Sequence, residues 1–210
     1  LCKEPLSGVG FDTWGVDCGM IDREGNLLGM PGSYRDAALD EENMNDVLAS
    51  LVPEEQDRDK AVKAGEKYAF EQTGIASLAY NTLYKLCYLN KAMPEQMAAA
   101  DKLLFMPNLI EYLFSGVVHS EYSIASTSQL LDMKEKKWAS ELIRKAGIDP
   151  KLLAPLDYAG KDLGPLRPEI AKEVGQENLH ILSVSGHDTA CAVAAVPARE
   201  EEFTFLSSGT

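Results

Sequence analysis

The sequence predicts an α/β protein in which short buried strands are flanked by helices. The clearest indication is the stretch 180–196, HILSVSGHDTACAVAAV, where an apolar run meets the turn residues Ser185 and Gly186 and then small residues that suit a helix. A second indication is that apolar residues recur at helical spacing in several other stretches, each bounded by glycine or proline. With 210 residues, 45% of them hydrophobic, the chain can form one large domain or two small ones around a substantial core.

Composition excludes several classes of function. The formal net charge of −13 argues against a nucleic-acid partner, which needs a basic face, although a substrate with several phosphates could still bind local basic groups. No apolar run is long enough to span a bilayer, and no signal-peptide pattern opens the chain. The four cysteines have no paired spacing, so we expect free thiols and a cytoplasmic protein. Because the chain begins without methionine and stops just after a strand-like run, we expect it to be cut at both ends.

The first third of the chain reads as strands joined by tight turns. Residues 9–22 suit a strand, a kink at residues 13–15 and a second strand that ends near Ile21. Residues 22–26 form the predicted hairpin loop, and residues 27–29 return as a short strand. Gly15 has two open interpretations, which are close approach of a ligand and a plain bulge.

The remainder of the chain reads mainly as helices. The acidic stretch 40–60 predicts a solvated helix and loop that could serve as a lid or an insertion. Residues 150–168 hold four prolines and several glycines and predict an extended loop, whereas residues 203–206 predict a final strand. Asn81 or Thr82 can cap the helix that follows them. Further predicted elements are helices at 61–72, 81–91, 94–100, 108–114 and 138–146, an apolar core run at 103–106, the start of a short helix at 171–174, and a strand beginning at 180.

The turn after the strand at residue 180 is the predicted ligand site, because open α/β sheets bind ligands at the carboxyl ends of their strands. Asp188 falls in the first turn of the following helix, where the helix dipole favours an ionised carboxylate that can act as a general base. The alternative is that Asp188 is a simple N-cap. Residues 126–129 could hydrogen-bond a polyol or only backbone. Residues 207–210 could cradle a phosphate or form a turn. No metal-ligand spacing and no GxSxG motif is present.

Eight segments, in the same order along the chain, resemble the FGGY family of carbohydrate kinases. Two of them, Thr-Trp-Gly-Val-Asp and Asn-Thr-Leu-Tyr, are similar to the branch that phosphorylates L-rhamnulose, whereas His-Asp-Thr and Ser-Ser-Gly-Thr resemble the family at large. The segments are spread along nearly the whole sequence, and so is the resemblance. They are residues 10–17, 34–36, 81–84, 104–107, 121–122, 125–131, 187–190 and 206–210.

The resemblance implies an actin-like, ribonuclease-H-like fold, with residues 1–210 as a partial N-terminal, sugar-binding domain and the nucleotide-side domain absent. It implies that Asp188 is the base in the ATP- and Mg²⁺-dependent phosphorylation of L-rhamnulose to L-rhamnulose 1-phosphate, by an enzyme that is a monomer. Gly15, His187, Asp188 and Thr189 match sugar-contacting positions, and Thr210 matches a position at the ATP phosphates. The alternatives are a kinase of L-fuculose or a pentulose, and a non-catalytic actin-like sugar-binding module.

The sequence also departs from the family pattern. The phosphate-binding hairpin of the form Asp-x-Gly that opens family members is absent, so we expect the chain alone to be inactive. Cys191 stands where serine is expected, and Asn108 stands where aspartate is frequent. Neither change removes a proposed catalytic group. The acidic stretch 40–59 aligns poorly with the family and receives no role.

Overall fold

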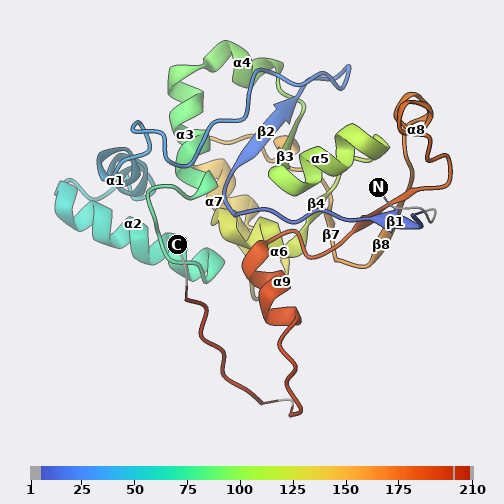
Figure 1. Cartoon of the computed structure of the whole chain (residues 1–210). Coiled ribbons are helices and arrows are strands. Elements are labelled where there is room, and N and C mark those ends of the chain that lie inside the picture. The colour runs from blue at the N-terminus through green and yellow to red at the C-terminus, as the bar shows by residue number, and fades with distance from the viewer. Residues whose placement is uncertain (1–5, 201, 209–210) are drawn as a thin grey trace.

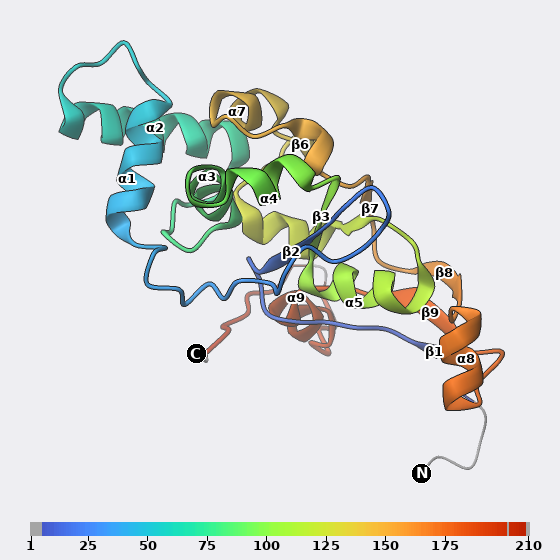
Figure 2. The ribbon, with the colours of Figure 1, turned by 90° about the horizontal axis from the view of Figure 1, so that it is seen from above.

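The structure, a computed structural model, describes residues 6–200 and 202–208. Figures 1 and 2 show two helices, α1 (Glu41–Ser50) and α2 (Arg58–Thr73), at one end of an elongated molecule. The helix α8 (Pro168–Val174) lies at the other end beside a small sheet, and the strands β2 (Cys18–Ile21) and β3 (Lys102–Phe105) lie between the two ends. No helix among the described residues is long and apolar enough to cross a membrane.

The sheet that leads to the predicted site mixes both strand directions. Its middle strand, β9 (His180–Ser183), pairs in parallel with β1 (Gly8–Val9) and antiparallel with β8 (Lys161–Pro165). Beyond these strands the two chain segments stay together, because Thr13 forms a further parallel bridge with His187. The strands β2 and β3 pair antiparallel, with Cys18 opposite Phe105. The kink at residues 13–15 therefore separates two pairing systems, as the sequence predicted.

The main hydrophobic core lies between β2, β3 and the helices around them. The helices α1 and α2 both begin with an aspartate cap, and the side chain of Asp40 accepts a 2.8 Å hydrogen bond from the amide of Asn43. The other core helices are α3 (Thr82–Ala92) and α7 (Ser140–Lys145), and the largest fully buried side chains include Leu48, Leu83, Tyr84, Phe105 and Leu142.

The acidic stretch 40–60 forms the predicted helix and loop, but its interpretation as a lid is wrong. Val47 and Leu48 on α1 are buried in the main core, so this helix is a structural part of the domain. A Cβ atom added to Gly65 of α2 would lie 1.9 Å from the carbonyl oxygen of Leu48, so the two helices meet backbone to backbone. The acidic residues occupy the outer side of a helix whose apolar positions are too few to give strong periodicity.

The predicted extended loop at 150–168 is also wrong. It contains a 3₁₀ helix (Pro150–Leu152), β7 (Leu156–Asp157) and β8. Gly160 and Gly164 adopt positive φ values of 95° and 92°, which let the chain turn between these short pieces. A register shift between Asp162 and Pro165 accommodates the proline, which cannot donate to a regular ladder.

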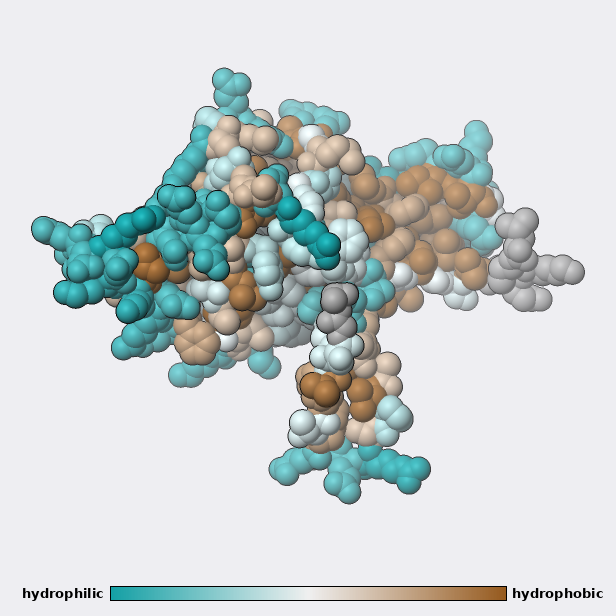
Figure 3. All heavy atoms as spheres, turned by 60° about the vertical axis from the view of Figure 1, so that its left-hand side comes forward, coloured by the Kyte–Doolittle hydropathy of each residue, from teal (hydrophilic) through white to brown (hydrophobic). Residues whose placement is uncertain are grey.

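The predicted strand at 203–206 does not form among the described residues. Figure 1 shows the chain after α9 (Asp188–Ala194) hanging away from the body of the molecule, and Figure 3 shows apolar atoms on the surface of the projection below the body. Phe203 is 47% and Leu206 90% exposed, and a strand needs a neighbour to accept its backbone hydrogen bonds. The return at residues 27–29 is likewise reduced to a single bridge between Leu27 and Ile21.

The remaining predicted elements are confirmed within a few residues. The helix α5 starts one residue before Pro107, which occupies its first turn, and it ends at Gly116 with a φ of 84°. The three described cysteines are free, and burial raises the pKa of Cys18 to about 11 and that of Cys87 to about 12. The other elements are α4 (Pro94–Ala99), α5 (Met106–Ser115), β4 (Ser120–Glu121), α6 (Tyr122–Ala125), a 3₁₀ helix (Ser126–Ser128), β5 (Leu131–Asp132), β6 (Lys137–Trp138) and α9 (Asp188–Ala194).

Candidate functional site

A hollow of about 610 Å³ lies where six separate segments of the chain meet. The kink after β1 supplies Trp14, Gly15 and Val16, and the turn before α9 supplies His187, Asp188 and Thr189. The loop between α2 and α3 forms another wall, and Thr127 lies on a fourth segment. The remaining lining residues are Tyr34, Ile75, Ala76, Leu78, Tyr80, Asn81 and Ser207. The structure therefore brings all the predicted sugar-contacting residues together in one place.

Asp188 lies at the mouth of this hollow, as the first residue of α9. Its backbone amide donates to the carbonyl of Thr13 at 2.9 Å, and its side chain is 55% exposed. Oδ1 accepts a 2.6 Å hydrogen bond from the amide of Thr189 and lies 3.3 Å from Nε2 of His187. None of the described residues donates to Oδ2. The predicted place in the first turn is confirmed, but His187 is the N-cap, so the interpretation of Asp188 as the cap is wrong.

The turn before Asp188 is held by a buried carboxylate that sequence analysis did not single out. Glu121 is 2% exposed, and its Oε2 accepts a 2.9 Å hydrogen bond from the amide of Gly186. The same carboxylate accepts from the amide and the hydroxyl of Ser123, at 3.0 and 2.5 Å, and from the amide of Ile124, at 3.2 Å. On the opposite side, the carbonyl of Gly186 accepts a 2.9 Å bond from the amide of Thr13. The turn is thus fixed from both sides.

The side chain of Asn108 holds the backbone of Glu121. Its Oδ1 accepts a 3.1 Å hydrogen bond from the amide of Glu121, and its Nδ2 donates to Glu111 at 2.9 Å. Glu111 also lies 2.8 Å from Nε2 of His119, and all of these side chains are buried. An asparagine side chain can donate and accept hydrogen bonds at once, so Asn108 serves both Glu121 and Glu111.

Gly15 is explained in part by packing. A Cβ atom on Gly15 would lie 2.8 to 3.0 Å from the side-chain atoms of Thr127, closer than real contacts allow. The next residue, Val16, has a φ of 65°, a strained value for a β-branched residue. Two hydrogen bonds hold it there, because its amide donates to Thr127 Oγ1 at 2.9 Å and its carbonyl accepts from Thr82 Oγ1 at 2.8 Å. Thr127 therefore sets the shape of the kink.

The hydroxyl-rich stretch 126–129 mostly bonds backbone. Ser126 and Ser128 donate to carbonyls three residues earlier, so for them the backbone alternative is confirmed. Gln129, with a φ of 60°, instead accepts from Nδ2 of Asn81 at 3.0 Å and donates to the carbonyl of Ile75. Asn81 stands at the start of α3 without making a side-chain cap bond. This Asn81–Gln129 pair holds the wall formed by the loop between α2 and α3.

The lining of the hollow bears on the predicted use of ATP and Mg²⁺. No lysine or arginine lines the hollow in the described part of the chain, so nothing there neutralises phosphate charge. Within the same residues, no group of three or more histidine, cysteine, aspartate or glutamate side chains could hold a metal ion. Thr210, the predicted nucleotide contact, lies outside the described residues. This half of the predicted chemistry therefore has no structural support here.

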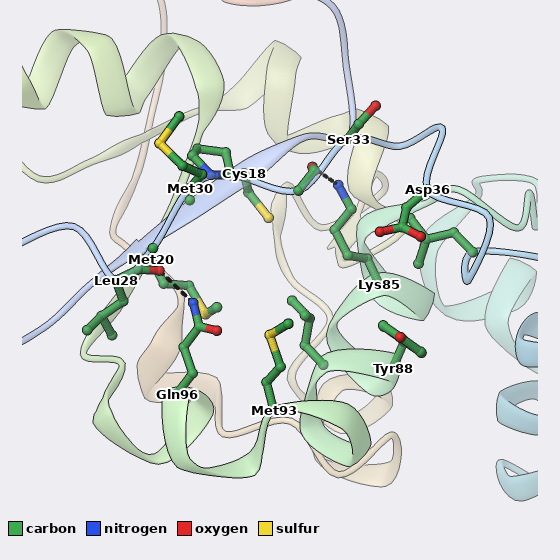
Figure 4. A pocket seen from close by; sticks show the side chains of 16 residues that line it. Cys18, Met20, Leu28, Met30, Ser33, Asp36, Lys85, Tyr88, Met93 and Gln96 are labelled. Atoms are coloured by element: carbon green, nitrogen blue, oxygen red, sulfur yellow. Dashed lines mark hydrogen bonds between the residues drawn. The ribbon is translucent and has the colours of Figure 1, made fainter.

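A second hollow of about 300 Å³ lies behind the kink, between the 28–33 loop and the helices α3 and α4 (Figure 4). Its walls carry Met20, Leu28, Met30 and Met93, and Lys85 lies at its edge. None of the predicted site residues lines it. Its walls also carry the polar side chains of Ser33, Asp36 and Gln96.

The fold and the site together define a sugar-kinase domain. Residues 54–195 match the family described as "FGGY family of carbohydrate kinases, N-terminal domain", and the chain belongs to that family. Among curated relatives, the rhamnulokinase of Bacteroides thetaiotaomicron is 34% identical over 207 residues, which is 99% of this chain and 40% of that protein. The rhamnulokinase of Enterococcus faecalis is 34% identical over 202 residues, or 96% of this chain and 37% of that protein. The chain thus spans about 40% of the length of such relatives.

Solved structures confirm the predicted actin-like α/β fold. The xylulose kinase of Lactobacillus acidophilus superposes with a TM-score of 0.71 at 16% identity, covering 89% of this chain and 35% of that one. A carbohydrate kinase from Novosphingobium aromaticivorans gives a TM-score of 0.70 at 22% identity, covering 92% and 38%. The identities are low, so these two likenesses show the shared fold only.

Proposed function

We propose that this chain is the sugar-binding part of a longer, ATP-dependent ketose kinase, with L-rhamnulose as the substrate and its 1-hydroxyl as the acceptor. The observation that carries the proposal is the exposed carboxylate of Asp188 at the mouth of the 610 Å³ hollow, on a turn that is fixed from both sides. The likeness to relatives named rhamnulokinase, over 96–99% of the chain, supports this choice of substrate.

The chain's own residues would bind, orient and deprotonate the sugar. His187 and the amide of Thr189 contact Oδ1 of Asp188, and this leaves Oδ2 to accept the proton of the 1-hydroxyl. The hydroxyl oxygen would then bond to the γ-phosphorus of ATP while the bond from that phosphorus to ADP breaks, so that ADP leaves. The backbone at Gly15 would lie against the sugar. Groups that hold ATP and Mg²⁺ belong, in this proposal, to the remaining part of the longer protein, where Thr210 would also act.

Two alternative functions use the same hollow. The first is phosphorylation of a different ketose, such as L-fuculose or a pentulose, by the same machinery. The second is sugar binding without catalysis. Both alternatives keep the hollow as the sugar site.

A ketose panel separates these functions. We expect the longer kinase to release ADP with L-rhamnulose at a higher kcat/KM than with L-fuculose, L-ribulose or D-xylulose, and the 210-residue chain alone to bind L-rhamnulose in calorimetry without releasing ADP. A higher kcat/KM for another ketose would reassign the substrate. Binding without ADP release by the longer protein would favour the non-catalytic module.

A further inference from the structure

We propose, building on the function above, that the indole face of Trp14 is the wall on which the sugar ring stacks, and that the buried Asp17–Lys85 ion pair sets the position of that indole. Trp14 lines the same hollow as Asp188. The proposal adds a sugar-contacting residue and two positioning residues to the site.

Trp14 is exposed and yet anchored. Its side chain is 47% exposed, but its Nε1 donates a 2.8 Å hydrogen bond to Oδ2 of Asp17. The bond fixes one edge of the indole and leaves aromatic surface available to a ligand. An indole has an apolar face and one polar edge, which suits the apolar C–H face of a sugar ring. Tyr34 and Tyr80, in edge-to-face contact at 6.0 Å, extend the aromatic lining of the hollow.

Asp17, which holds the indole of Trp14, is itself paired with the buried Lys85. Asp17 and Lys85 have side chains that are 5% and 4% exposed, and their Oδ1 and Nζ atoms are 2.5 Å apart. Nζ of Lys85 also donates to the carbonyl of Gly32 at 2.8 Å, a bond that Figure 4 draws beside Ser33. The two oxygens of Asp17 therefore have separate partners, one charged and one aromatic.

A buried ion pair adds little stability relative to apolar side chains of the same volume. We therefore assign the Asp17–Lys85 pair a positioning role. Here it fixes a carboxylate at the end of the strained kink, next to Val16 with its φ of 65°. Backbone strain of this kind is kept at sites where geometry matters. Because the kink carries Trp14 and Gly15 into the hollow, a rigid Asp17 fixes the wall of the site beside Asp188, whose amide donates to the carbonyl of Thr13.

The fluorescence of Trp14 offers a direct test, since the chain has two tryptophans. Trp138 is half-buried outside the hollow, where its Nε1 donates to Ala154 at 3.0 Å. In the Trp138→Phe variant of the 210-residue chain, only Trp14 emits. We expect saturating L-rhamnulose to change this emission, with an affinity equal to that measured by calorimetry for the unchanged chain.

Three further variants separate stacking from anchoring. Trp14→Ala should weaken calorimetric L-rhamnulose binding by about tenfold or more, and Trp14→Phe, which keeps a ring, by about threefold. The paired change Asp17→Leu with Lys85→Met removes both charges at similar volume, so the fold should persist while binding weakens about three- to tenfold through lost preorganisation. Circular dichroism checks the fold of each variant.

Unchanged Trp14 emission at calorimetric saturation would overturn the stacking role and leave the proposed function standing. If Trp14→Ala fails to fold, this emission still decides that role. Full affinity in a folded Asp17→Leu, Lys85→Met variant would overturn the positioning role. If no ketose of the panel binds the unchanged chain, the proposed function fails, and the stacking role fails with it.

Discussion

Asp188→Asn should abolish most of the turnover of the longer kinase while leaving its stability unchanged. Asparagine keeps the shape of the side chain and can still accept from the amide of Thr189, the 2.6 Å bond that holds Oδ1. It cannot take a proton from the sugar hydroxyl. General-base catalysis contributes about 10²- to 10⁴-fold, so kcat should fall by that factor, or about 3 to 5 kcal/mol of barrier.

The matched control is Asp59→Asn, at an exposed aspartate in the first turn of α2. It makes the same chemical change at a similar helical position outside the hollow. We expect its kcat, its KM for L-rhamnulose and its melting temperature to equal those of the parent. An Asp188→Asn enzyme with kcat within about threefold of the parent would remove the base assignment, since a lost base costs at least about 10²-fold.

Glu121→Gln should destabilise the fold and loosen the turn that carries Asp188. The glutamate uses both oxygens as acceptors, from the amides of Ser123, Ile124 and Gly186. Glutamine has one acceptor oxygen, so its NH₂ group must face at least one of these donors inside the protein. An unsatisfied buried polar group costs about 1–3 kcal/mol, and we expect the free energy of unfolding to fall by that amount.

Urea unfolding of the 210-residue chain measures this change. Glu173→Gln, at an exposed position on α8, is the control and should shift the free energy of unfolding by less than about 0.5 kcal/mol. L-rhamnulose should also bind Glu121→Gln more weakly, because Gly186 would lose a fixed partner. Equal stability of Glu121→Gln and the parent would show that this carboxylate does not hold the turn.

The parts of the site that could be predicted are local in sequence. The strand, turn and helix around Asp188 follow from a run of neighbouring residues, each with a clear preference. The role of Glu121 could not be predicted in this way, because its partner Gly186 lies 65 positions away in the sequence. No local sequence pattern marks a glutamate as buried. The same holds for Lys85, which meets Asp17 across 68 positions from the face of an ordinary-looking helix.

The incorrect predictions of secondary structure and of its role have related causes. In the stretch 40–60, Val47 and Leu48 are buried and the backbone of Leu48 meets Gly65 of a second helix, so the local apolar pattern is weak. In the stretch 150–168, prolines and glycines predict a loop, yet neighbouring chain segments accept β7 and β8 as short strands. At 203–206, by contrast, a strand-like pattern finds no partner among the described residues. In each case tertiary contacts decide the outcome.

The most direct test of Asp188 as the base at the sugar site is a crystal structure of the longer kinase with L-rhamnulose bound. We expect the sugar to lie in the 610 Å³ hollow. Its 1-hydroxyl oxygen should lie within about 2.6–3.2 Å of a carboxylate oxygen of Asp188, the reach of a general base. A sugar bound in the hollow beside Lys85, or one whose 1-hydroxyl points away from Asp188, would contradict this expectation.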